Sequence, residues 1–302
     1  MRLLTVRHVT TYSYSEPVRF GEHRMMFRPR ASHDLRLLRS QLDIRPQPAA
    51  LRWLHDVFDN SVAIATFDAA ATELRFDSTV TLEHIETPLP DYVLEAGARE
   101  FPFAYSDDER PDLTGALARH YPADDLAAWT ARFLPPGRNS TMGLLQAMTR
   151  GIKDECRYLP RVEKGVQSPG ETLRRRSGSC RDFAVLMMEA ARSRGLAARF
   201  VSGYIFVPDA DRGAVVGGGA THAWMQAYLP GAGWVDFDPT NDIVGNRNLI
   251  RVAVAWDQRN ALPLWGTFVG PPACVRGMDV TVSVVERLTP VSAPRCAPAP
   301  LS

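Results

Sequence analysis

Cysteine is scarce in this sequence, and long apolar runs are absent. The 302 residues contain four cysteines, and no two of them form a CxxC pair. No histidine lies within a few residues of a cysteine either, so the spacing of a structural zinc site is missing. We expect neither a metal nor another cofactor. The four thiols are Cys156, Cys180, Cys274 and Cys296.

No stretch reaches the roughly 18 apolar residues of a membrane-spanning helix. The first residues, MRLLTVRHVTTYSYSEPV, also lack the continuous apolar segment of a signal peptide. We therefore expect a cytoplasmic protein that does not contact a membrane, with reduced thiols and no structural disulfide.

An excess of charge of one sign is also missing. Thirty-five basic and 34 acidic residues leave a net charge of +1, which argues against a general binder of nucleic acid or membrane surfaces. Apolar residues make up 45% and charged residues 23%, as in ordinary globular proteins. The length is too great for one small core and predicts two domains, or one domain with a large appendage. The oligomeric state stays open.

Residues 1–105 are predicted to form an all-β domain, most simply a sandwich. Leu74, Phe76 and Ser78 alternate with charged and polar neighbours, which is typical of a half-buried strand. Asp59-Asn60-Ser61 predicts a turn between two strands. No helical periodicity interrupts this part of the chain.

Helical spacing begins after residue 105, so the second part, residues 106–288, should be of the α+β class. Helices are expected within 112–134 and 140–160, with Ser140 as an N-cap, and in a short segment at 169–175. The clearest helix runs from Cys180 to Arg194 and ends at Gly195. Strands return afterwards and include a hairpin turn at 230–233, and residues 289–302 are predicted to be a disordered tail.

Cys180 stands where this clearest helix begins. A helix N-terminus offers unpaired N–H groups and partial positive charge, which favour a thiolate and can also bind an oxyanion. Gly178 and Ser179 leave room for a substrate backbone. The pattern is compatible with a nucleophile, although an isolated cysteine is more often a buried structural thiol.

A cysteine nucleophile needs a base and a group that orients the base. His222 is the one histidine after Cys180. If Leu229 and Trp234 flank the hairpin turn, His222 lies opposite positions 238–241. Asp238 is then within reach, and Asp236, the alternative, lies nearer Trp224. The two tryptophans Trp224 and Trp234 are expected to pack around the site.

Three blocks in this order resemble the bacterial branch of the transglutaminase-like superfamily, which includes transglutaminase-like cysteine peptidases. They are SGSCRDFAVLMMEAARSRGLAARFVSGY, the H-A-W strand in THAWMQAYL, and GWVDFDPTN. RHVTTYSYSEPVRFGEHRMMFRPR is similar to the N-terminal β domain of that branch, and LPLWGTF with DVTVSVVERL is similar to its C-terminal strands.

The resemblance implies a papain-like core with helices packed on an antiparallel sheet. In it Cys180 attacks, His222 acts as base and then acid, and Asp238 orients His222. The expected reaction is acyl transfer from an amide through a thioester, on a protein or peptide substrate. Resolution by water would make a cysteine protease or amidase, and resolution by an amine a protein-glutamine γ-glutamyltransferase.

Other interpretations stay open at this point. The chain could be a non-catalytic protein-binding module on the same fold, or Cys180 and His222 could belong to a metal site with a further ligand that spacing does not identify. The oxyanion would be held by the Cys180 N–H and a second donor, for which Tyr158 and Gln167 are candidates.

Overall fold

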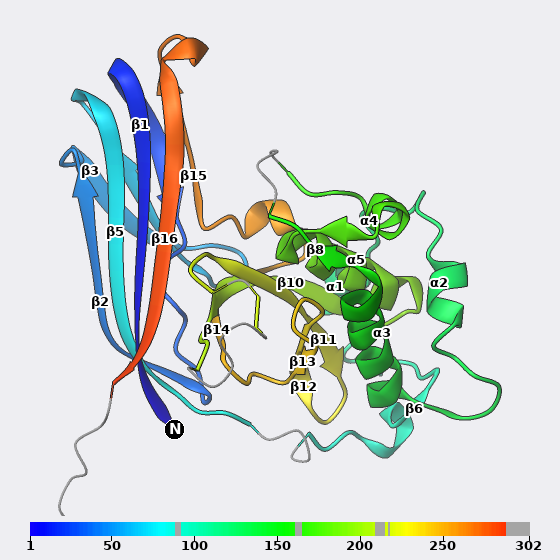
Figure 1. The fold of residues 1–302 in the computed structure, drawn as a ribbon. Helices are drawn as coiled ribbons and strands as arrows, with labels where there is room; N and C mark the ends of the chain where they lie inside the picture. The colour runs from blue at the N-terminus through cyan, green and yellow to red at the C-terminus, as the bar shows by residue number, and fades with distance from the viewer. Residues whose placement is uncertain (88–91, 161–164, 209–214, 217, 288–302) are drawn as a thin grey trace, which may run out of the picture.

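Two antiparallel sheets organise the chain in the computed structural model, which describes residues 1–87, 92–160, 165–208, 215–216 and 218–287 (Figure 1). The first sheet has seven strands in the order β2-β5-β1-β4-β3, and β15 and β16 also pair with β1. Its strands are β1 (Arg2–Met25), β2 (Leu35–Arg45), β3 (Ala50–His55), β4 (Ser61–Thr66), β5 (Ala70–His84), β15 (Leu264–Val269) and β16 (Val275–Arg287).

Strand β1 belongs to both halves of this sheet. Its first half pairs with β5 and β16, and its second half, from Arg19 to Met25, pairs with β15 and β4. Register shifts after Ser13 mark the bend between the halves, as expected where a strand departs from regular pairing. The predicted sandwich is thus one sheet folded over β1. The enclosed buried cluster is Tyr14, Val18, Phe20, Met25, Phe27, Ile44, Ala63, Ala65, Leu74, Phe76 and Cys274.

The alternation predicted for residues 74–79 is present in β5. Leu74 and Phe76 are 0% exposed and Ser78 is 4% exposed. The predicted turn at Asp59-Asn60-Ser61 joins β3 to β4, and Asp59 there has a φ of 61°.

The expected domain boundary needs a correction at its C-terminal side. The predicted second domain, residues 106–288, includes the last strands, but β15 and β16 are hydrogen-bonded to β1. The first sheet therefore combines residues from both ends of the described chain. The sequence pattern predicted a strand at β16 and the family resemblance predicted one at β15, but neither identifies the distant strand that is the partner. The predicted tail, residues 289–302, lies outside the described residues.

The second sheet forms the α+β part, in the order β13-β12-β11-β10-β14. Two-residue strands form two small ladders beside it, β6 with β7 and β8 with β9. The strands of the five-stranded sheet are β10 (Ala198–Ile205), β11 (His222–Leu229), β12 (Gly233–Asp238), β13 (Ile243–Val244) and β14 (Leu249–Ala255). The short ones are β6 (Glu100–Phe101), β7 (Asn139–Ser140), β8 (Arg157–Tyr158) and β9 (Ser177–Gly178).

Helices lie on one side of the five-stranded sheet in Figure 1. Ser140 caps α3 by accepting a hydrogen bond from the Gly143 N–H, as predicted. The predicted short helix at 169–175 is α4. The helices are α1 (Thr114–Leu117), α2 (Ala127–Ala131), α3 (Thr141–Glu155), α4 (Pro169–Arg175) and α5 (Cys180–Ser193).

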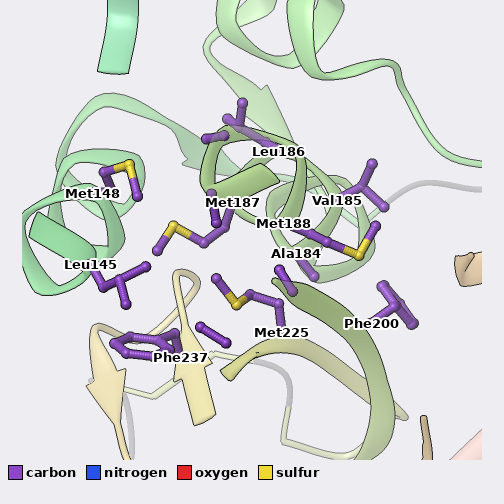
Figure 2. Packing of buried hydrophobic residues seen from close by; sticks show 14 of the residues in the cluster. Leu145, Met148, Ala184, Val185, Leu186, Met187, Met188, Phe200, Met225 and Phe237 are labelled. Carbon is purple, nitrogen blue, oxygen red and sulfur yellow. The ribbon is translucent and has the colours of Figure 1, made fainter. Parts of the chain in front are cut away.

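Helix α5 is almost completely buried between α3 and the sheet. Figure 2 shows Met187 and Met188 of α5 among side chains from α3 and from strands β10, β11 and β12. Small residues such as Ala184 and Ala190 let the helix approach the sheet closely. The helix ends at Ser193 rather than Arg194, and Gly195, two residues further on, has a φ of +77° that suits glycine. A helix surrounded in this way holds its first residue in a fixed position.

A second apolar interface joins the two sheets. Leu4 and Val6 of β1 pack with Tyr204 of β10 and Ile250 of β14. His8 lies in the same interface, where its Nδ1 is 2.9 Å from the Tyr204 hydroxyl and its Nε2 is 3.0 Å from Thr10 Oγ1. Burial lowers the pKa of His8 to about 4. The imidazole is therefore neutral in the folded protein at neutral pH.

This buried histidine predicts a loss of stability in mild acid. Between pH 6.5 and about 4 the unfolded chain binds a proton at His8 and the folded chain does not, so the free energy of unfolding falls as pH falls. The full effect is about 3 kcal/mol. Chemical denaturation of His8→Gln across this range should show a weaker pH dependence than the unmodified protein. The matched change of the exposed His55, His55→Gln, should leave the dependence as it was, and equal slopes for all three proteins would contradict the prediction.

Candidate active site

Cys180 is the first residue of α5 and is 7% exposed. Its backbone N–H has no acceptor within the helix because of that position. The two residues of β9 lead into it and pair in parallel with β8, so that Tyr158 lies beside Gly178. A side chain at Gly178 would clash, since a Cβ there would lie 2.9 Å from both Asp182 Cβ and Gln167 Nε2. Glycine therefore allows the chain to pass close to the start of the helix.

A buried carboxylate fixes the segment before the cysteine. Asp182 accepts hydrogen bonds from Ser179 N at 2.8 Å, from Ser179 Oγ at 2.9 Å and from Gln167 N at 2.7 Å. The Gln167 side chain donates in turn to the Ser177 carbonyl at 2.9 Å. An acidic residue in the first helical turn is stabilised by the helix dipole as well. These bonds tie the residues directly before Cys180 both to the first turn of α5 and to the segment at Gln167.

His222 begins β11 and is 1% exposed. Its Nε2 is 2.8 Å from Asp238 Oδ2, and its ring stacks on Trp224 with ring centroids 5.9 Å apart. The other ring nitrogen, Nδ1, is buried and hydrogen-bonded to no described residue. Cys180 is close enough to the imidazole to affect its ionisation. Nδ1 is therefore the nitrogen available to exchange a proton with the thiol.

The surroundings favour a charged imidazole. Burial by itself would lower the pKa of His222, but the carboxylate of Asp238 and the neighbouring Cys180 side chain raise it to about 10. Burial would likewise raise the pKa of Asp238, but His222 and further hydrogen bonds hold it below its usual value. The pair is a buried imidazolium–carboxylate ion pair at neutral pH.

Asp238 is fully hydrogen-bonded. Its Oδ1 accepts from the Thr240 N–H at 2.9 Å, and its Oδ2 accepts from Asn241 Nδ2 at 2.9 Å in addition to His222. Asn241 and Thr240 did not stand out as site residues in the sequence. The D-P-T-N order that contains them was the available signal, because a turn directly after a strand end returns N–H groups to the preceding carboxylate.

The structure separates the two candidate aspartates. Leu229 pairs with Gly233 rather than Trp234, so the register differs by one residue from the predicted register. Asp236 is then opposite Gln226, and it accepts a hydrogen bond from Trp224 Nε1 at 2.6 Å. Asp238 contacts His222 and Asp236 does not. The three predicted residues Cys180, His222 and Asp238 thus meet at one place, and their catalytic roles remain a prediction.

The remaining cysteines lie elsewhere. Cys156 follows α3 and is buried, and burial raises its pKa to about 11. Cys274 is part of the cluster inside the first sheet, and Cys296 falls outside the described residues. Within the described ranges no group of three or more histidine, cysteine or carboxylate side chains is placed to hold a metal ion.

Comparison with known proteins agrees with this arrangement. Residues 4–83 match the bacterial transglutaminase-like N-terminal region, and residues 128–239 match the transglutaminase-like superfamily. The two matched segments together span more than half of the chain. The chain belongs to the transglutaminase-like superfamily, and its N-terminal sheet is the one found in the bacterial members.

Relatives extend this match over nearly the full length. An uncharacterised protein of Mycobacterium leprae is 28% identical over 287 residues, covering 94% of this chain and 98% of the relative. An uncharacterised protein of Mycobacterium tuberculosis is 28% identical over 296 residues, covering 93% and 91%. The crystal structure of a proposed cysteine protease from Cytophaga hutchinsonii shares the fold, with a TM-score of 0.68, 18% identity, and coverage of 96% of this chain and 92% of that one.

The family supports a cysteine-dependent hydrolase or acyltransferase in general terms. The predicted α+β class with a transglutaminase-like core is confirmed. Among the described helices, none combines the length and apolar character needed to cross a membrane.

Replacing Asp238 should lower the pKa of His222, because burial would then be the main effect on the imidazole. In Asp238→Asn the charge that raises the pKa is gone, so the pKa of His222 should fall from about 10 to below neutrality. NMR titration of the imidazole nitrogens would measure it. His8, which is not among the groups that affect the ionisation of His222, serves as an internal reference. An unchanged alkaline titration of His222 in the variant would show that Asp238 does not set its charge.

Proposed function

We propose that the protein is a thiol enzyme that transfers acyl groups from amides, with Cys180 as nucleophile, His222 as general acid and base, and Asp238 as its orienting partner. One observation carries the proposal. The buried imidazole has Nε2 bonded to Asp238, while Nδ1 has no hydrogen-bond partner among the described residues and adjoins Cys180. A proton on Nδ1 can then pass between the sulfur and the leaving group.

The reaction balances with these groups alone. The Cys180 thiolate attacks the amide carbonyl carbon, a C–S bond forms, and the carbonyl electrons move to oxygen. When the C–N bond breaks, the imidazolium gives its proton to the departing nitrogen, and a thioester remains. His222 next takes a proton from water or from an amine, which attacks the thioester and releases the thiolate.

We favour water as the second nucleophile, which makes the protein an amidase or protease with a protein or peptide substrate. Transamidation of a glutamine side chain differs in that an amine replaces the water. Incubating the protein with casein and a fluorescent primary amine separates them, because hydrolysis releases ammonia or new peptide ends without incorporating the amine. A cytoplasmic location remains a separate prediction, tested by cell fractionation.

The oxyanion needs two donors, and we assign the second to the Tyr158 hydroxyl. The Cys180 N–H is the first, since it has no helical acceptor. Burial together with the charge of Cys180 raises the pKa of Tyr158 to about 12, so its hydroxyl stays protonated, and it bonds to no described residue. Gln167, the other candidate, already donates its side-chain N–H to Ser177.

Alkylation tests the nucleophile directly. Cys180 should react with iodoacetamide at least tenfold faster at pH 6.5 than the remaining thiols do in Cys180→Ala, because a thiolate paired with imidazolium persists below the pKa of about 8.5 of a free thiol. His222→Ala should remove most of that advantage. Peptide mass mapping identifies the labelled site. Labelling of Cys180 no faster than Cys296 would defeat the proposed function and favour a non-catalytic binding module.

Tyr158→Phe should separate oxyanion binding from thiolate formation. We expect kcat to fall by a factor on the order of 10² while KM changes little. The rate of iodoacetamide alkylation should stay unchanged, because alkylation at saturated carbon creates no oxyanion. Tyr12→Phe in the first sheet is the matched control and should leave both rates as they are. Equal losses in turnover and alkylation would point to a structural role for Tyr158, and an unaltered kcat would dismiss it as a donor.

A further inference from the structure

Strands β11 and β12 carry two aromatic–carboxylate pairs in succession. His222 and Trp224 are two residues apart on β11 and lie on the same face, and Asp238 and Asp236 are two residues apart on β12. Asp238 binds the imidazole at 2.8 Å and Asp236 binds the indole Nε1 at 2.6 Å. The proposed chemistry uses the first pair and leaves the second without a role.

Apolar packing explains why Trp224 is buried but not why its N–H meets a carboxylate. Its neighbours in the cluster are Val201, Ile205, Leu249 and Val254. A phenylalanine would satisfy that cluster without requiring a buried acid. Asp236 is 4% exposed, and burial raises its pKa while Arg251 and the Trp224 N–H favour its charged form, so a carboxylate there costs free energy that packing alone does not repay. The hydrogen bond between Trp224 and Asp236 therefore indicates that Trp224 has a role in addition to packing.

The plane of Trp224 lies almost parallel to the imidazole, at 27° and a centroid separation of 5.9 Å. A cation within about 6 Å of an aromatic face is attracted to it, and tryptophan is the strongest of the three aromatic residues in this respect. An indole whose N–H donates to a carboxylate is polarised toward a more negative ring. This contact stabilises protonated His222 much more than neutral His222.

Among the described residues, other ionisable groups around the two pairs are few. Asp238 of β12 and Cys180 of α5 face the imidazole. Arg251 of β14, Arg199 of β10, Asp34 and Tyr92 act on Asp236 or are acted on by it. None of these last four is among the groups that shift His222. Trp224 is the structural link between Asp236 and the imidazole.

We infer that Trp224, held and polarised by Asp236, is a positioning residue that stabilises His222 as an imidazolium directed at Cys180. This inference rests on the proposed function, since it assigns the second pair to the same proton transfer. Trp224 itself is 0% exposed and does not meet the substrate.

Two alkylating reagents test this without a known substrate. Iodoacetate is an anion and is drawn to the imidazolium beside Cys180, whereas neutral iodoacetamide is not. The ratio of their rates at Cys180 should therefore fall at alkaline pH, with a midpoint where His222 loses its proton. Rates measured in Cys180→Ala are subtracted, so that other thiols do not contribute.

In Trp224→Phe the midpoint should move to lower pH by about half a unit to one unit, because phenylalanine is the weaker partner and has no N–H for Asp236. Asp236→Asn should move the midpoint in the same direction by a smaller amount. If Trp224→Phe does not fold, the midpoint of Asp236→Asn tests the inference instead. Trp234→Phe, the same change one strand away and next to Arg199, should not move it.

The outcomes distinguish the role of Trp224 from the proposed roles of Cys180 and His222. An alkaline fall in the wild-type ratio, with the same midpoint in Trp224→Phe and Asp236→Asn, overturns the inference and leaves the Cys180–His222 pair intact. A uniform loss of rate at every pH without a change in midpoint also overturns it, since that is the mark of a merely structural residue. A wild-type ratio that does not fall with pH overturns both the inference and the proposed function.

Discussion

The ion pair between His222 and Asp238 is the interaction on which the rest of the second domain depends. Both side chains are completely buried and their nitrogen and oxygen are 2.8 Å apart. Removing two charges from water costs several kcal/mol for each ion, which their attraction offsets only when the geometry is good and the remaining lone pairs are bonded. The chain meets that condition with the Thr240 N–H and the Asn241 side chain.

Backbone structure supplies the precision that the pair needs. The tight turn between β11 and β12 sets the register, and Gly231 in it has a φ of +88°. A Cβ at this glycine would lie 2.6 Å from Glu95 N, so the turn also fits under the segment that follows the first domain. On the other side, the buried carboxylate of Asp182 ties down the residues before α5. The sulfur and the imidazole therefore approach each other from two separately fixed elements.

The parts of the fold that depend on local pattern could be predicted from the sequence. The β5 alternation, the Ser140 cap, the α4 helix and the α5 start at Cys180 follow from periodicity and capping, which act over a few residues. The choice of Asp238 over Asp236 followed from hairpin pairing, although the turn proved one residue tighter than expected. These features need only neighbouring residues to determine them.

Features that depend on distant partners could not be predicted in this way. The pairing of β15 and β16 with β1 joins residues that lie from 239 positions apart (Met25 with Leu264) to 284 positions apart (Leu3 with Arg287), and no periodicity encodes it. The same holds for the burial of Asp182, which accepts a hydrogen bond from the Gln167 N–H, and for the burial of Glu189 and Arg192, which bond to the His120 N–H and to the Trp256 carbonyl. Charged residues are normally exposed, so their burial becomes visible only when their partners are placed.

The long strand β1 has one further consequence. It lies between β5, which is translated soon after it, and β16, which is translated after every strand of the second sheet. The ribosome therefore completes the entire second domain before β1 can acquire its final neighbour on that side. Until then one edge of β1 has unpaired main-chain groups, and such edges readily pair with other chains. The order of synthesis thus lets the first sheet close only after the strands of the second sheet have been made, because β15 and β16 follow them in the chain.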